Sequence, residues 1–127
     1  MNPIRIFVVD DNIHARDILK RILNSYVGDF EIVGESATGQ GAVIMLEDAQ
    51  PDVIMLELDM HSETKSPDII RAIRAANPAV KIVLCSSPTE RDKILQAHDD
   101  GLMDDFVEKP YIRTKVQSAV RNVVKRR

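Results

Sequence analysis

The sequence is poor in the residues that mark several common classes of protein. It has one cysteine in 127 residues, no tryptophan, and only 4% aromatic residues. A single cysteine excludes an internal disulfide framework and a cysteine-based metal site, so we interpret Cys85, which lies in an apolar run, as a buried core thiol. The longest apolar run, Ala42 to Leu46, is far too short to span a membrane, and no signal-peptide pattern opens the chain. We therefore expect a cytoplasmic protein with no membrane partner.

An excess of basic residues is also missing. The net charge is −3, which disfavours nucleic-acid binding by this domain. The basic residues near the C-terminus, Arg121 and Lys125 to Arg127, are interpreted as cations that stabilise the last turns of a helix. The composition, 44% hydrophobic and 29% charged, is typical of a globular domain, and the length fits a single domain over residues 1–127.

Apolar periodicity predicts five strands that alternate with five helices. The expected strands are Ile4–Val9, Phe30–Gly34, Val53–Leu56, Lys81–Cys85 and Asp105–Glu108. The expected helices run from Ile13 to Tyr26, from the Thr38–Gly41 turn to about Asp48, from Ser66–Pro67 to just before Asn77, from a capping box at Ser87–Glu90 to about Asp99, and from Ile112 to Lys125. Such alternation predicts an α/β fold, a doubly wound five-stranded parallel sheet with helices on both faces.

Polar residues follow the ends of four of these strands. Asp10 and Asp11 come after the first strand, Glu57 after the third, Ser86 after the fourth and Lys109 after the fifth. In the strand order 2-1-3-4-5, which we adopt from known doubly wound sheets, the first and third strands are neighbours and their carboxylates converge. Three like charges need a cation, and an all-oxygen set suits magnesium, which we expect to bind with modest affinity. A hydroxyl and an ammonium group beside a metal suit a phosphoryl group.

Other interpretations of these residues remain open. Glu57 can instead reach Lys109 directly and be neutralised without a metal. The Gly34–Gly41 segment lacks the spacing of a nucleotide-binding loop, so it is interpreted as a turn and helix entry. The three histidines are scattered along the chain, and no nucleophile–base pair indicates a hydrolase or another enzyme.

Four stretches together resemble the receiver domains of bacterial two-component response regulators, of the CheY-like single-domain chemotaxis type with a flavodoxin-like fold. These are Val8–Asn12, Pro51–Leu56, Ser86 and Phe106–Pro110. The resemblance implies that the acidic pair binds magnesium and that a strand-three aspartate accepts a phosphoryl group from a histidine kinase or phosphotransfer protein. It also implies that Ser86 contacts the phosphate, that Lys109 pairs with it, and that the rotamer of Phe106 reports the active state. The peptide between Lys109 and Pro110 is expected to be cis.

The sequence departs from the family at the phosphoacceptor position, where Glu57 replaces aspartate. Asp59 lies where the family offers a backbone carbonyl to the metal, so its side chain is the alternative acceptor. We expect a signalling switch that is independent of phosphorylation or partly mimics it. The alternative is a phosphorylation-independent interaction module with a vestigial acidic site. A flavin carrier is disfavoured because few aromatic residues are present to stack on the ring.

The resemblance also predicts how the switch reaches its partners. A downstream protein is expected on the face of the fourth helix, fifth strand and fifth helix, because Ser86 and Lys109 lead directly into those elements. The protein is expected to be a monomer or a weak dimer. The residues assigned to the output face are Thr89, Glu90, Lys93, Phe106, Tyr111 and Lys115.

Overall fold

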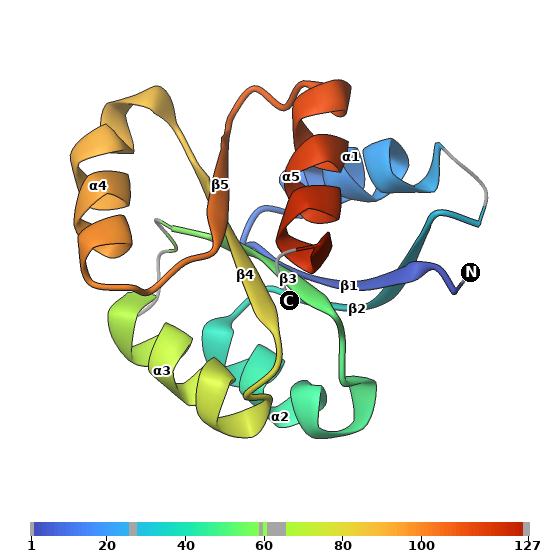
Figure 1. The fold of residues 1–127 in the computed structure, drawn as a ribbon, viewed down its shortest axis with the longest axis horizontal. Coiled ribbons are helices and arrows are strands. Elements are labelled where there is room, and N and C mark those ends of the chain that lie inside the picture. The colour runs from blue at the N-terminus through green and yellow to red at the C-terminus, as the bar shows by residue number, and fades with distance from the viewer. Residues whose placement is uncertain (1, 26–27, 59, 61–65, 126–127) are drawn as a thin grey trace.

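A five-stranded parallel sheet forms the centre of the protein in the computed structural model, which describes residues 2–25, 28–58, 60 and 66–125. The strands are β1 (Ile4–Val9), β2 (Phe30–Ser36), β3 (Val53–Glu57), β4 (Lys81–Ser86) and β5 (Asp105–Glu108). Their order across the sheet is β2-β1-β3-β4-β5, and every neighbouring pair is parallel (Figure 1). The predicted fold class and strand order are confirmed.

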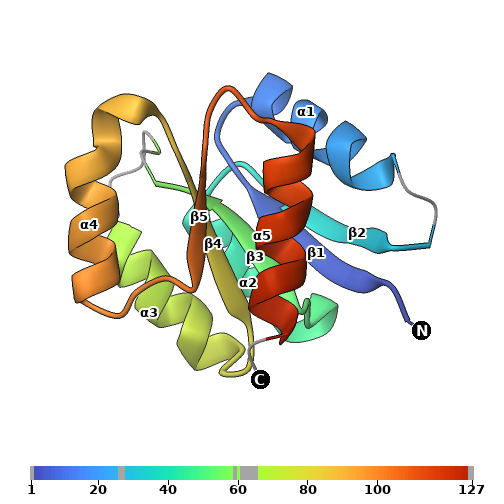
Figure 2. The same cartoon turned by 45° about the horizontal axis from the view of Figure 1, so that its top comes forward.

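Helices cover both faces of this sheet (Figures 1 and 2). The helices are α1 (Ile13–Asn24), α2 (Gly39–Ala49), α3 (Ser66–Ala76), α4 (Arg91–Asp99) and α5 (Arg113–Lys125), with a short 3-10 turn, η1 (Pro88–Glu90), before α4. Because side chains alternate along a strand, Ile6 and Val8 pack with α1 and α5, whereas Phe7 and Val9 pack with α2, α3 and α4. Both faces of the central strands are therefore buried, as their continuous apolar runs predict.

Polar caps lead the strands directly into the helices. The Asn12 side chain accepts hydrogen bonds from the backbone N–H groups of His14 (2.8 Å) and Ala15 (3.2 Å) and so caps α1. The Thr38 hydroxyl accepts a hydrogen bond from the Gly41 N–H (2.9 Å) at the start of α2. These caps fix short loops at the C-terminal ends of β1 and β2, which is the edge of the sheet where the candidate site lies.

Several local details refine the sequence-based expectations. Strand β2 continues to Ser36, two residues beyond the predicted end at Gly34, and its pairing with β1 shifts register between Ile6 and Phe7. Helix α1 ends at Asn24, and the predicted end at Tyr26 lies outside the described residues. The Lys109–Pro110 peptide is cis, as expected. Of the helices in the described ranges, none has the length and apolar character needed to cross a bilayer.

Candidate functional site

The carboxyl ends of β1, β3, β4 and β5 bring four of the predicted residues to one edge of the sheet. Asp10, Glu57 and Ser86 are buried, with exposed fractions of 1%, 5% and 1%. Lys109 joins them from β5 and is half-buried. The four residues come from positions up to 99 apart in sequence, and the crossover topology alone makes them neighbours.

Lys109 is the centre of this edge. Its ammonium nitrogen Nζ lies 2.5 Å from Glu57 Oε2 and 3.1 Å from Asp10 Oδ2. Burial by itself lowers the pKa of the Lys109 ammonium, but the hydrogen bond and charge of Glu57 and the charge of Asp10 outweigh burial and raise the pKa above its ordinary value. Lys109 is therefore a firmly charged cation between two buried carboxylates.

Every polar group of Asp10 has a partner. Its backbone N–H donates to the Ser36 carbonyl (3.1 Å), and its carbonyl accepts from Arg16 Nη1 (2.6 Å). Its carboxylate accepts a hydrogen bond from the Asn12 N–H at Oδ1 (2.9 Å) and the Lys109 ammonium at Oδ2. The loop after β1 thus presents the Asp10 carboxylate in one orientation.

The structure does not arrange Asp10, Asp11 and Glu57 as the three-carboxylate cluster that the sequence predicts. Within the described ranges, no three acidic, histidine or cysteine side chains are grouped so that they could hold one metal ion. The physical reason is that Lys109 occupies the space between Asp10 and Glu57, whereas Asp11 is exposed. Asp59, the predicted carbonyl ligand and alternative acceptor, lies outside the described residues.

The residues nevertheless fit a divalent cation in their chemistry. The carboxylates of Asp10 and Asp11 are hard oxygen donors in adjacent positions, as magnesium prefers. The Lys109 ammonium is a positive charge already held between Asp10 and Glu57, so it acts as a stand-in for a cation at this edge. A metal ion there would compete with Lys109 for the same oxygens.

Ser86 is tied to Lys109 through the backbone. The Lys109 N–H donates to the Ser86 carbonyl (2.7 Å), and Ser86 pairs with Glu108 in the β4–β5 ladder. The side chain of Phe106, two residues before Glu108 on β5, is 39% exposed. Lys109 and Ser86 are therefore linked through the backbone to β5, the strand that carries Phe106.

Two residues assigned to the output face are not fully exposed. Glu90 is 7% exposed, and its carboxylate accepts a hydrogen bond from the Ser87 N–H (2.8 Å), as the predicted capping box requires. Tyr111 is half-buried against the core between the sheet and α5, where burial raises the pKa of its hydroxyl. Thr89, Lys93, Phe106 and Lys115 are exposed.

Cys85 has the buried environment that the sequence predicts. It is 1% exposed and lies directly opposite Glu57 in the β3–β4 ladder. Burial is the main reason that the pKa of its thiol is raised to about 12, with a smaller contribution from the Glu57 charge. Cys85 is therefore a neutral core side chain behind the acidic edge.

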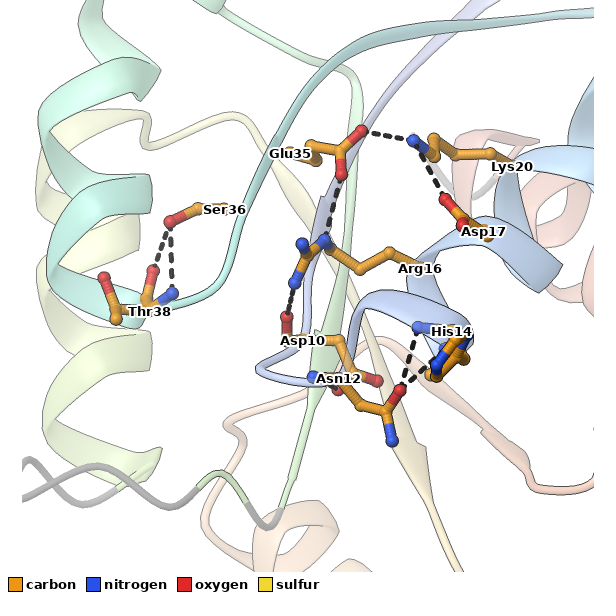
Figure 3. A network of polar contacts seen from close by, with 10 residues as sticks. Asp10, Asn12, His14, Arg16, Asp17, Lys20, Glu35, Ser36 and Thr38 are labelled. Atoms are coloured by element: carbon orange, nitrogen blue, oxygen red, sulfur yellow. Dashed lines mark hydrogen bonds and ion pairs between the residues drawn. The ribbon is translucent and has the colours of Figure 1, made fainter.

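Sequence reasoning missed the polar network that supports Asp10 from the side of β2. Arg16 and Lys20 of α1 both contact Glu35 of β2, and Arg16 also reaches the Asp10 carbonyl (Figure 3). The spacing of Arg16 and Lys20, four residues apart on one face of a helix, was the available signal. Their acidic partner lies on another element, so the sequence pattern alone could not identify it.

A doubly wound sheet whose carboxyl edge carries Asp10, Glu57, Ser86 and Lys109 defines a receiver-type signalling domain. Residues 6–121 match the family model described as the response regulator receiver domain, and the chain belongs to that family. It is similar to the chemotaxis protein CheY of Thermotoga maritima, with 30% identity over 121 residues that span 95% of this chain and 98% of that protein. We therefore describe it as a CheY-like receiver domain of two-component signalling.

Other relatives show the same domain in larger proteins. The response regulator domain of Thermotoga maritima CheB superposes on this chain with a TM-score of 0.84 at 25% identity. The match covers 98% of each chain. The chain is also 35% identical over 113 residues to a protein-glutamate methylesterase/protein-glutamine glutaminase of Rhodopseudomonas palustris, which spans 87% of this chain but 30% of that enzyme. The resemblance to the methylesterase is therefore confined to part of that protein, and the residues of this chain match a receiver domain, which is a signalling module.

Proposed function

We propose that this receiver domain acts as a signalling switch without phosphorylation at Glu57, and that the Glu57–Lys109 pair partly reproduces the effect of a phosphoryl group. The observation that supports the proposal is the contact between Glu57 Oε2 and the Lys109 ammonium at 2.5 Å. By the family resemblance, Lys109 is the residue that pairs with phosphate. Glu57 places a carboxylate against that lysine without any phosphoryl group.

The length of glutamate argues against phosphoryl transfer to this residue. Its carboxylate lies about 1.5 Å farther from the backbone than that of aspartate, by one carbon–carbon bond. Positioning supplies most of the catalysis in phosphoryl transfer, and a displacement of about 1 Å can cost on the order of a hundredfold in rate. The Glu57 carboxylate is in addition held by Lys109 rather than free to attack.

Mimicry by Glu57 is incomplete for two reasons. A carboxylate carries one negative charge, whereas a phosphoryl group carries about 1.5 to 2 near neutral pH. Phe106 also keeps 39% of its surface exposed although Glu57 already contacts Lys109. A partial shift between two populations of the domain therefore fits better than a complete switch.

Magnesium is part of the proposal, as an ion bound by the carboxylates of Asp10 and Asp11. When bound, the ion neutralises carboxylate charge and offers a positive centre to phosphate oxygens. Lys109 must move away from Asp10 for the ion to use the Asp10 Oδ2 atom, because the ammonium lies 3.1 Å from it. Glu57 could share its Oε2 atom with the ion only by giving up part of its contact with Lys109.

An interaction module with a vestigial acidic site is the second candidate function. It is favoured by the contacts of Lys109 with both Asp10 and Glu57, which give the buried charges a structural role. Both candidates use a downstream partner on the face made by α4, β5 and α5. By the family resemblance, a histidine kinase or phosphotransfer protein is the expected upstream partner for both candidates.

Incubation of the native protein and Glu57→Asp with acetyl phosphate and magnesium, followed by intact mass measurement, tests the proposal. We expect no adduct on the native protein and a single phosphoryl adduct on Glu57→Asp, because only the shorter carboxylate leaves room for the phosphoryl group. Glu57→Gln serves as the control without a carboxylate at position 57. An adduct mapped to Glu57 would overturn the proposal, an adduct on Asp59 would move the acceptor, and unmodified Glu57→Asp would favour the vestigial module.

A further inference from the structure

Arg16 makes the contact that joins the acidic loop to the edge of the sheet. Its Nε donates to Glu35 Oε1 (2.9 Å), and its Nη1 donates to the carbonyl of Asp10 (2.6 Å), as Figure 3 shows. The Arg16 side chain is only 12% exposed, against 35% for Glu35. A single guanidinium group therefore spans from β2 to the Asp10 peptide with most of its surface removed from water.

The end of β2 holds Asp10 from both sides of the peptide. Ser36 accepts the Asp10 N–H through its carbonyl (3.1 Å), and Glu35, the preceding residue, anchors the arginine that binds the Asp10 carbonyl. With its backbone fixed in this way, the Asp10 carboxylate accepts the Asn12 N–H (2.9 Å) and faces Lys109. Both β2 residues therefore take part in the contacts that hold the Asp10 backbone.

The irregularity in β2 explains why Glu35 can reach Arg16. Ile6 pairs with Ile32, but Phe7 pairs with Gly34, so one residue is extra in β2 and Glu35 pairs with Val8. Val8 belongs to the core on the α1 and α5 side, whereas Val9 belongs to the opposite core. In a regular strand Glu35 would pair with Val9 and lie on the face away from α1, because a shift of one residue reverses the face. The extra residue thus delivers the carboxylate to α1.

Glu35 stays ionised as the anchor. It accepts hydrogen bonds from both Lys20 and Arg16, and these contacts lower the pKa of the Glu35 carboxyl below its usual range. Lys20 also contacts Asp17 at 3.4 Å. Among the residues drawn in Figure 3, no contact joins Lys20 to Asp10. Lys20 therefore shares the anchor with Arg16 and provides a matched comparison within the same network.

We propose that Arg16, anchored by Glu35, is a positioning residue that sets the orientation of Asp10 at the acidic edge. The inference rests on the proposed role of that edge as a magnesium site and extends it to a residue that touches neither the metal nor Glu57. Arg16 acts through the Asp10 carbonyl, so its removal loosens the loop between Asp10 and Asn12. Partners that orient a metal ligand from outside its contact shell are worth about ten- to a hundredfold in metal affinity.

The Asn12 amide provides a readout that needs no metal. Its proton reports the hydrogen bond to Asp10 Oδ1, so its chemical shift and its exchange with solvent can be followed by NMR in native protein, Arg16→Ala, Arg16→Lys and Lys20→Ala. We expect an upfield shift and faster exchange in Arg16→Ala, an intermediate value in Arg16→Lys, and a native signal in Lys20→Ala. Unchanged Asn12 signals in Arg16→Ala, or equal changes in Lys20→Ala, would overturn the proposal.

Magnesium affinity, measured by titration calorimetry on the same proteins, is the second readout. We expect about a tenfold weaker affinity in Arg16→Ala and less than a twofold change in Lys20→Ala. If Arg16→Ala fails to fold in urea titrations, Glu35→Gln, which keeps the aliphatic part of Arg16, takes its place with the same expected direction. If the native protein binds no magnesium, the proposed metal site fails, whereas the Asn12 signals still decide whether Arg16 positions Asp10.

Discussion

At the scale of single residues, the acidic edge depends on Lys109. Asp10 and Glu57 are 1% and 5% exposed, and two carboxylates so thoroughly buried repel each other unless a cation lies between them. The Lys109 ammonium supplies that cation at 3.1 Å from Asp10 and 2.5 Å from Glu57. One side chain thus takes the place of a metal in the charge balance of the site and occupies the oxygens that a metal would use.

Removal of Lys109 should therefore make the stability of the protein depend on magnesium. For Lys109→Met in metal-free buffer, we expect the free energy of unfolding to fall by about 1–3 kcal/mol, less than for a fully buried ion pair because Lys109 is 30% exposed. Millimolar magnesium should restore part of the loss by binding the uncovered carboxylates. Urea titrations with and without magnesium measure both effects, with the exposed Lys115→Met as control. Equal stability of native and Lys109→Met protein without metal would contradict the prediction.

The sequence predicts the residues of this edge better than it predicts their contacts. Asp10, Glu57, Ser86 and Lys109 could be placed together because each follows a strand in a parallel sheet, which is a property of sequence order and topology. Their pairing could not be predicted in the same way. Whether Glu57 turns to a metal or to Lys109 depends on side-chain length and local geometry, and both alternatives were compatible with the residue types. In the structure, Glu57 contacts Lys109.

At the scale of elements, strand β2 shows a feature that no periodicity reveals. Alternation of apolar residues predicted an end at Gly34, but the strand continues to Ser36 after one extra residue. Gly34 permits this register because the Phe7 ring lies against its backbone. A Cβ atom at position 34 would be 2.5 Å from the Phe7 ring. A contact between neighbouring strands thus decides the path of β2, and such contacts cannot be deduced from one strand's sequence.

Gly34→Ala should accordingly destabilise the protein through a steric clash with Phe7. We expect a loss of about 1–3 kcal/mol in the free energy of unfolding, as for other insertions of a carbon atom into a packed core. The same substitution in a Phe7→Leu background should cost less, because the smaller side chain leaves room for the new methyl group. Urea titrations of the four proteins form a double-mutant cycle. Costs that are equal in the two backgrounds would show that Phe7 is not the cause.

At the scale of the whole molecule, β5 connects the acidic edge with the proposed output face. The Lys109 N–H binds the Ser86 carbonyl, and the next residue toward the N-terminus, Glu108, forms an ion pair with Arg91 of α4 (3.1 Å). A groove of about 680 Å³ lies along β5 and α5, with Phe106 and Lys115 among its lining residues. Leu95, Phe106 and Ile112 expose apolar surface, from 39% to 63%, on α4, on β5 and just before α5. The proposed partner face therefore carries exposed apolar side chains, and Lys109, which contacts Glu57, lines the groove.

A phosphoryl analogue at the acidic edge should therefore change the groove only when the residue at position 57 can bind it. We expect beryllofluoride with magnesium to shift the backbone amide signals of Phe106 and Lys115 in Glu57→Asp, because the analogue supplies the charge and length of a phosphoryl group on aspartate and draws on Lys109. In the native protein the longer, lysine-bound carboxylate excludes the analogue, so these signals should stay unchanged. Glu57→Gln controls for effects of the reagent elsewhere. Two-dimensional NMR titrations of the three proteins separate the outcomes. The same shifts in the native protein would show that Glu57 still accepts the analogue. Shifts in Glu57→Asp that are confined to the Asp10 loop would show that the acidic edge and the groove are not coupled.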